Sequence, residues 1–215
     1  MDGLFGLFLI TITASALLFE YYRPESRTRR ALRRAEVVSI AAARDGAVVK
    51  IIGTVRYGER TVKSSLTGRT CAYYTVIVDK ISPQSTELIR EADGADFFVA
   101  DDSGVALIRF GAIRPAAALV NDRRRSTSTF FGDVILERFM KARGQSAEGI
   151  LGFKDLRAYE GVVEAGERVA VVGLARWIAD PDAAGGGYRE TPKRLVLEAT
   201  EAAPLLLSDD PSVVR

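Results

Sequence analysis

The sequence has no histidine and only one cysteine, Cys71, among its 215 residues. A single cysteine cannot form an intramolecular disulfide, and a structural zinc site with Cys and His ligands cannot be built. The same absence excludes Ser-His-Asp triads and Cys-His pairs, so metal-dependent hydrolysis would need ligands that are all carboxylates. We therefore predict no cofactor, no metal site and no catalytic residues.

The positive charge is concentrated in one short segment. Residues 23–34 hold six arginines against one acidic residue, Glu25. These arginines are Arg23, Arg27, Arg29, Arg30, Arg33 and Arg34. Of the 30 basic and 28 acidic side chains in the chain, 24 and 25 lie after residue 34, which gives that part a net charge of −1.

An uncharged apolar run directly precedes the arginines. It covers residues 3–19, and Glu20, Tyr21 and Tyr22 follow. A helix that crosses a bilayer needs about 20 apolar residues, and tyrosines favour the membrane interface. We expect residues 1–22 to form a transmembrane anchor, with residues 3–22 in contact with lipid. Basic residues mark the cytoplasmic side, so the N-terminus should lie outside and the folded domain in the cytoplasm.

Two features of this region have alternative interpretations. Ala14-Ser15-Ala16 has the form of a signal-peptidase site, although Asp2 precedes the apolar run and no basic residue does. The arginines are predicted to lie on the membrane surface, within a basic juxtamembrane linker of residues 23–46. A nucleic-acid-binding arm is the other interpretation of the arginine cluster.

The rest of the chain has the pattern of a β protein. Short runs rich in β-branched residues are bounded by glycine and polar turns, which predicts strands. The predicted strands cover residues 47–57, 71–80, 97–100, 105–110, 168–177 and 194–199. Asp101 to Gly104 suit a tight hairpin turn, and Gly53 suits a bulge or bend. The short spacing favours a largely antiparallel sheet.

One segment interrupts the strands with a helical pattern. Residues 133–143 place Val134, Ile135, Phe139 and Met140 on one side, and Gly144 is a plausible stop. We predict a mainly β fold, an OB-like antiparallel barrel with one inserted α-helix, in addition to the N-terminal membrane helix. A small sandwich is the alternative. The predicted β domain covers residues 47–203, and residues 204–215 form a C-terminal tail.

Three segments in order resemble a known family. Residues 63–74 (KSSLTGRTCAYY), 97–110 (FFVADDSGVALIRF) and 159–173 (YEGVVEAGERVAVVG) resemble the GIDE-type, or "beside a membrane", domain. This domain occurs in mitochondrial outer-membrane ubiquitin ligases and in bacterial relatives. The matching residues are Leu66, Gly68, Cys71, Tyr74, Asp101, Asp102, Gly104, Glu160, Gly166 and Gly173. The resemblance implies that they form turns and core, and that they are not catalytic.

The resemblance also implies what this chain cannot do. The ligases of the family transfer ubiquitin through a RING that binds zinc with cysteines and histidine. This chain has no histidine and no cysteine besides Cys71. We therefore expect a ubiquitin-ligase-related but non-catalytic interaction or scaffold module, with an unidentified protein partner.

The sequence leaves two alternative functions, a nucleic-acid-binding module and an unrecognised enzyme. An OB-type nucleic-acid-binding module at the membrane is disfavoured by the net charge of −1 after residue 34. For an unrecognised enzyme, the candidates are a Ser-Lys dyad within Lys63-Ser64-Ser65 and a reactive Cys71, which is expected to be a buried, inert thiol. Residues 185–187 (GGG) are expected in a hairpin loop. Residues 123–125 (RRR) are expected in a solvated loop, with a headgroup or partner contact as the alternatives.

Overall fold

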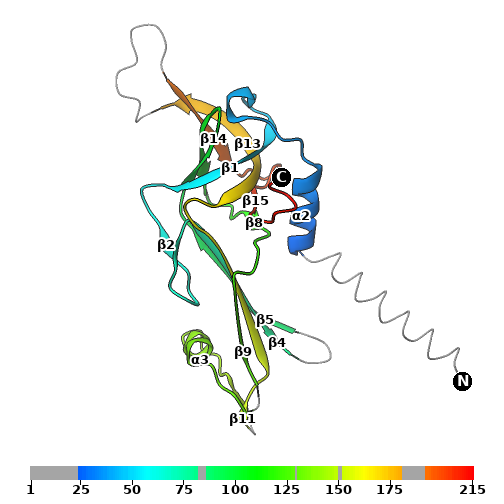
Figure 1. Cartoon of the computed structure of the whole chain (residues 1–215), viewed down its shortest axis with the longest axis vertical. Coiled ribbons are helices and arrows are strands. Elements are labelled where there is room, and N and C mark those ends of the chain that lie inside the picture. Colours follow the sequence, from blue (N-terminus) through cyan, green and yellow to red (C-terminus); the bar gives the residue numbers. More distant parts are fainter. Residues whose placement is uncertain (1–23, 82–85, 129, 150–151, 181–191) are drawn as a thin grey trace, which may run out of the picture.

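A computed structural model describes residues 24–81, 86–128, 130–149, 152–180 and 192–215. This part of the chain is elongated and mainly β (Figure 1). A barrel forms one end, with helix α2 (Pro24–Arg34) along its side, and a second sheet with a short helix forms the other end.

Five strands close the barrel. They are β1 (Val48–Tyr57), β6 (Phe97–Asp101), β7 (Gly104–Arg109), β14 (Lys193–Glu198) and β13 (Arg168–Ala179), and β13 pairs with β1. All neighbours are antiparallel except β7 and β14, which are parallel. The mainly β prediction is confirmed, and the barrel is consistent with the OB-like arrangement. Five of the six predicted strands lie in it.

Strand β1 bends where it changes partner. It pairs with β13 up to Thr54 and with β6 from Thr54 onward. At Gly53 a Cβ atom would lie 2.4 Å from the carbonyl oxygen of Ala100. Only glycine allows the two backbones to approach this closely, so the predicted irregularity is a bend at a barrel corner.

The second sheet was not predicted as a separate layer. Its order is β5 (Thr86–Gly94), β4 (Tyr73–Lys80), β12 (Leu156–Val163) and β9 (Arg123–Thr127), all antiparallel. The predicted strand of residues 71–80 therefore belongs to this sheet and not to the barrel. The insertions after β1 and after β7 provide all four strands.

Shorter elements complete the described part. They are η1 (Ile40–Ala42), β2 (Val62–Lys63), β3 (Thr70–Cys71), β8 (Ala116–Ala117), β10 (Glu148–Gly149), β11 (Gly152–Phe153) and β15 (Leu206–Ser208). Strand β15 pairs with β13, so the predicted tail contributes a strand to the barrel sheet. The predicted linker contributes α2 and η1.

The predicted helix is present as α3 (Val134–Lys141). Asp133 is its N-cap and accepts hydrogen bonds from the backbone N–H groups of Ile135 and Leu136. The buried side chains are Leu136, Phe139 and Met140. Val134 is 68% exposed, so the predicted apolar side was wrong at this residue.

Apolar side chains form three clusters. The largest fills the barrel and includes Tyr73 and Val163 from the second sheet. The second lies between that sheet and α3. The third lies beneath α2 and contains Leu32, Ile52 and Val213.

The predicted membrane anchor, residues 1–22, lies outside the described residues. Among the helices of the described part, none has the length and apolar character that a membrane span requires.

Candidate functional site

Glu160 on β12 is a fully buried carboxylate at the junction of the second sheet and the hairpin of β2 and β3. The hydroxyl of Ser64 donates a hydrogen bond to its Oε1 atom, and the hydroxyl of Thr67 donates to Oε2 at 2.5 Å. The backbone N–H of Thr67 donates to Oε1 at 3.2 Å. Three donors therefore converge on one side chain, as a buried polar group requires. They hold the turn between β2 and β3 against β12.

Arg69, in the same hairpin, forms ion pairs with residues next to the second sheet. Its Nε atom lies 3.1 Å from Glu164 Oε1, and its Nη1 atom lies 3.1 Å from Asp122 Oδ2. Hydrogen bonding to Glu164 raises the pKa of Arg69. Asp122 also accepts a hydrogen bond of 3.2 Å from the backbone N–H of Val162 on β12. The ion pairs of Arg69 with Glu164 and Asp122 are partly exposed, so they fix the position of the hairpin more than they stabilise the fold.

The structure brings five of the ten family-signature residues to this junction. Gly68 has φ +76°, which the turn requires, and Leu66 and Cys71 are buried beside it. Tyr74 is buried on β4 and its hydroxyl donates a 2.9 Å hydrogen bond to Glu91. Glu160 completes this group, which holds chain segments together.

The other five signature residues lie elsewhere. Asp101, Asp102 and Gly104 form the predicted β6–β7 turn. Asp101 accepts hydrogen bonds from the backbone N–H groups of Ile40 at 2.8 Å and of residue 103 at 2.7 Å. Burial alone would raise the pKa of Asp101, but these hydrogen bonds lower it. The turn therefore anchors η1 to the barrel.

The two remaining signature glycines are structural as well. Gly166 has φ +91° in the turn that follows β12. At Gly173 on β13, a Cβ atom would lie 2.7 Å from the Leu205 side chain. The five signature residues outside the junction thus occupy separate turn and packing positions in the described structure.

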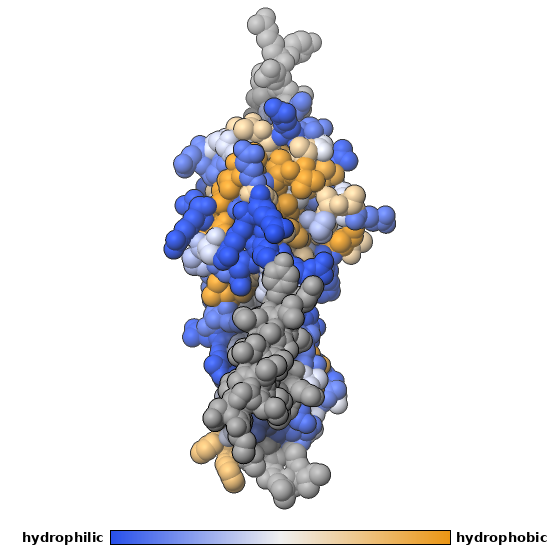
Figure 2. Space-filling model, turned by 90° about the vertical axis from the view of Figure 1, so that its right-hand side faces the viewer, coloured by the Kyte–Doolittle hydropathy of each residue, from blue (hydrophilic) through white to orange (hydrophobic). Residues whose placement is uncertain are grey.

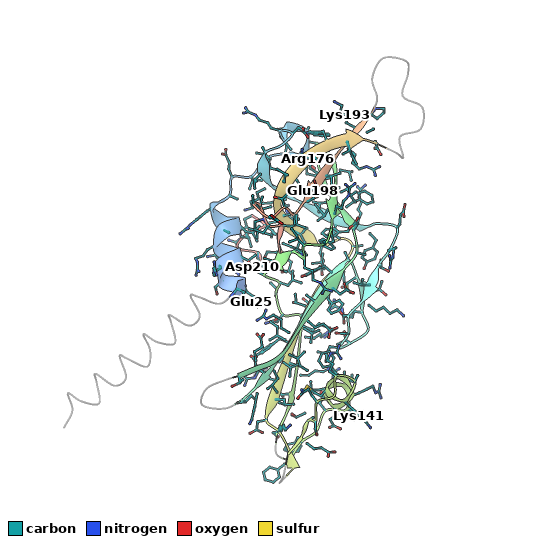
Figure 3. All side chains as sticks on the ribbon, turned by 180° about the vertical axis from the view of Figure 1, so that it is seen from behind. Glu25, Lys141, Arg176, Lys193, Glu198 and Asp210 are labelled. Carbon is teal, nitrogen blue, oxygen red and sulfur yellow. The ribbon has the colours of Figure 1, made fainter. Side chains whose placement is uncertain are left out.

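The arginines of residues 27–34 lie on α2 and face two directions, whereas Arg23 lies outside the described residues. Arg29 Nε lies 2.5 Å from Asp210 Oδ2, and Arg33 Nη2 donates a 2.5 Å hydrogen bond to the Ser212 hydroxyl. Figure 3 shows Asp210 beside this helix. These two arginines bind the C-terminal segment, which no local sequence pattern could reveal.

Arg27 and Arg34 are exposed, and apolar side chains lie beyond the end of the same helix. Val37 is 47% exposed, and Val48 at the start of β1 is 57% exposed. Figure 2 shows one side of the molecule, where hydrophobic and hydrophilic residues lie next to one another on the barrel end. Sequence reasoning identified the arginines but missed the valines, because isolated apolar residues carry no periodic signal.

Two of the candidate nucleophiles, Cys71 and Ser64, are buried, whereas Ser65 is half-buried. Cys71 is 0% exposed, and burial raises its pKa to about 12, so the predicted inert thiol is confirmed as buried. Ser64 is 2% exposed and donates its hydroxyl hydrogen to Glu160, so Lys63 is not its partner. Neither side chain is accessible to a substrate in this arrangement.

The remaining predicted segments also have defined positions. Residues 123–125 begin the edge strand β9, so the predicted loop was wrong. Arg125 pairs with Asp133 at 3.0 Å, and the Arg124 guanidinium lies 5.8 Å from the Tyr159 ring centre. A groove of about 640 Å³ beside α3 was not predicted; Glu137, Arg138 and Lys141 are among the residues that line it. Residues 185–187 lie outside the described part.

No family model matches this chain, and searches of curated proteins and of solved structures gave no match. The resemblance to GIDE-type domains therefore stays a prediction.

Proposed function

We propose that the protein is a single-pass membrane-anchored, non-catalytic interaction module of the GIDE type. Residues 3–22 would hold it in the bilayer, with the OB-like barrel at the cytoplasmic face. The observation that carries this proposal is the fixed position of α2, which presents exposed arginines directly after the apolar run.

The docking of α2 supports an orienting role. Leu32 is 0% exposed in the third cluster, and the Arg29–Asp210 pair holds the same helix to the C-terminal segment. Arg27 and Arg34 are therefore held outward by a fixed helix. Each basic side chain near an anionic membrane surface contributes about 1 kcal/mol of attraction. A rigid basic face would fix the orientation of the barrel relative to the membrane surface.

The non-catalytic part of the proposal is supported by how the polar side chains are used. Glu160, Arg69 and Asp101 each hold two or more chain segments together. Confinement to a membrane raises the local concentration of partners, so modest affinity suffices for an interaction module.

The anchor is tested by extraction of the full chain from bacterial membranes. We expect the protein to stay in the membrane pellet after an alkaline carbonate wash, because an apolar helix is not released by charge or salt. Release into the supernatant would refute the anchor. A C-terminal alkaline phosphatase fusion should be inactive, and an active one would reverse the proposed topology.

The orienting role of α2 is tested with the single tryptophan of the chain, Trp177. Energy transfer from Trp177 to dansyl-labelled lipid should fall when Arg27 and Arg34 are both changed to Glu in vesicles containing phosphatidylserine. The matched control changes Arg123 to Glu, which removes an exposed arginine of the second sheet. Equal transfer in the α2 variant and the control would refute the orienting role.

A further inference from the structure

The outer surface of the barrel carries an apolar row with an arginine at each end. Phe97, Val99, Ala106, Ile108, Leu195 and Leu197 belong to the barrel core. Alternate residues of a strand point to opposite faces, so Phe98 on β6, Leu107 on β7 and Val196 on β14 point outward. Strand register places these three side by side, between Arg56 on β1 and Arg176 on β13. We call these five residues the barrel strip.

This row is unusual for the outside of a sheet. An antiparallel sheet that faces water normally carries polar side chains on that face. Phe98 and Leu107 are partly exposed, and Val105, in the next row of β7, is 38% exposed. Leu107 is at the centre of the row, and Val196, next to Arg176, is fully buried, so Phe98 and Leu107 are the accessible apolar residues of the strip. Apolar surface that polar groups surround is typical of an interaction site.

The charge around the strip is positive and incompletely neutralised. Arg109 and Arg176 share one carboxylate, Glu198, at 3.8 Å each. Figure 3 shows Arg176 and Glu198 together on the barrel. The side chains of Arg109 and Arg176 are 40% and 52% exposed, so a second carboxylate can reach them. Arg56 is exposed and has no ion pair within the described part of the chain.

We propose that the barrel strip docks an extended protein segment with an acidic residue at each end and apolar residues between them. This inference rests on the proposed function and names the surface and chemistry of the interaction. Arg56 and Arg176 would bind the two carboxylates, and Phe98 and Leu107 would contact the apolar side chains. Carboxylates suit guanidinium groups because the pair can form two parallel hydrogen bonds.

The strip also sets the length of the partner segment. Four strand-to-strand steps of about 4.8 Å separate Arg56 from Arg176, a span of at most about 19 Å. An extended peptide covers about 3.3 Å per residue, so its acidic residues should lie about five to seven positions apart.

A protein segment fits this surface better than single-stranded nucleic acid does. Base stacking needs exposed aromatic rings, and Phe98 is the one aromatic residue of the strip. The guanidinium carbon of Arg194 already lies 5.2 Å from the ring centre of Phe98. A base would have to displace this side chain, whereas an apolar side chain can pack at the edge of the ring and against Leu107.

The test selects peptides from a random 12-residue library on phage, with the full chain in phosphatidylcholine nanodiscs as the target. We expect enriched sequences with two acidic residues at the stated spacing and apolar residues between them. The affinity of one enriched synthetic peptide is then measured by fluorescence anisotropy. Arg56→Glu and Arg176→Glu should each weaken it at least about tenfold, and Arg123→Glu should leave it unchanged.

Reversing the charges on both the protein and the peptide distinguishes loss of binding from loss of folding. The double variant Arg56→Glu/Arg176→Glu should bind a peptide in which both acidic residues are replaced by lysine, which also shows that the variant is folded. Absence of enrichment, enriched peptides without acidic residues, or equal affinity in the variants would overturn the proposal. Binding of a 12-residue oligothymidylate that these variants abolish would overturn it in favour of nucleic acid. Loss of the anchor would appear only in the carbonate wash, so the two failures are distinguishable.

Discussion

At the scale of single residues, buried polar groups in this protein connect segments that are distant in sequence. Glu160 is 0% exposed and accepts hydrogen bonds from Ser64 and from Thr67, more than 90 positions away. The sequence resemblance singled out Glu160 but gave it no partners. A lone glutamate in a strand has no local pattern that identifies its hydrogen-bond donors. The sequence therefore predicted Glu160 as a site residue but did not predict its partners.

Removal of the Glu160 carboxylate should destabilise the fold. Glu160→Ala leaves buried donors of Ser64 and Thr67 without an acceptor, which costs about 2–4 kcal/mol of unfolding free energy. Glu160→Gln should cost less, because an amide oxygen still accepts hydrogen bonds. Urea denaturation measures both, with the exposed Glu59→Ala as the control. Equal stability of Glu160→Ala and the control would contradict this role.

Asp209 makes stability depend on pH. Burial raises its pKa to about 7, although the backbone N–H of Val120 donates a 2.7 Å hydrogen bond to it. Asp122 and Glu167 raise it further. The folded-state pKa lies above the unfolded value, so the native state retains a proton that the unfolded state releases. This contribution to stability is complete below about pH 4 and is lost as pH rises to about 7.

Asp209→Asn should remove this pH dependence, because an amide accepts the same hydrogen bond without a charge. The unfolding free energy of the variant minus that of the native chain should increase by roughly 2–3 kcal/mol from pH 5 to pH 7. It should not increase further above pH 8. Urea denaturation at pH 5, 7 and 8.5 gives the difference. A difference that does not change with pH would show that Asp209 is ionised throughout.

At the scale of elements, the sequence predicted strands more reliably than their sheets. A short run rich in β-branched residues predicted the β4 region as a strand, but such a run does not say which sheet a strand joins. Strands β5 and β9 were missed because their charged residues obscure the pattern of a buried face. Helix α3 was predicted closely because Asp133 and Gly144 are local capping signals.

Helix α2 should depend on its buried leucine. Leu32→Ala leaves a cavity in the third cluster and should lower the unfolding free energy by about 2–4 kcal/mol. Hydrogen exchange within residues 28–34 should rise further than in the barrel strands, because only α2 loses its main contact. The exposed Ala31→Ser is the matched control. Unchanged exchange would mean that the polar contacts of Arg29 and Arg33 hold the helix without the Leu32 side chain.

At the scale of the whole molecule, the apolar cluster of the barrel extends into the second sheet through Tyr73 and Val163. Phe110 follows β7 and contacts both parts, since its ring centre lies 5.5 Å from that of Tyr73 and 5.8 Å from that of Phe97. At Gly94 a Cβ atom would lie 2.5 Å from Tyr73 and 2.6 Å from Phe110. The sequence predicted Phe110 as a strand residue, but its role as a connection depends on an unpredicted second sheet.

This shared cluster predicts cooperative unfolding, and Phe110 connects its two parts through ring contacts with Tyr73 and Phe97. Trp177 reports on the barrel, where its Nε1–H donates a 2.8 Å hydrogen bond to the carbonyl of Ala43. In detergent, thermal unfolding of the full chain should give one midpoint by Trp177 fluorescence and by hydrogen exchange of β12. Phe110→Ala removes the ring between the two parts and should lower stability by about 2–3 kcal/mol.

The two midpoints should also separate in Phe110→Ala, because each sheet keeps its own cluster while the contacts between them are lost. We expect the second sheet to unfold first, since its cluster is smaller and its edges are open on both sides. The exposed Phe131→Ala provides the control for loss of an aromatic ring and should leave both midpoints unchanged. If both probes still coincide in Phe110→Ala, the cooperative link between the sheets must run through Val163 and the chain around Glu160.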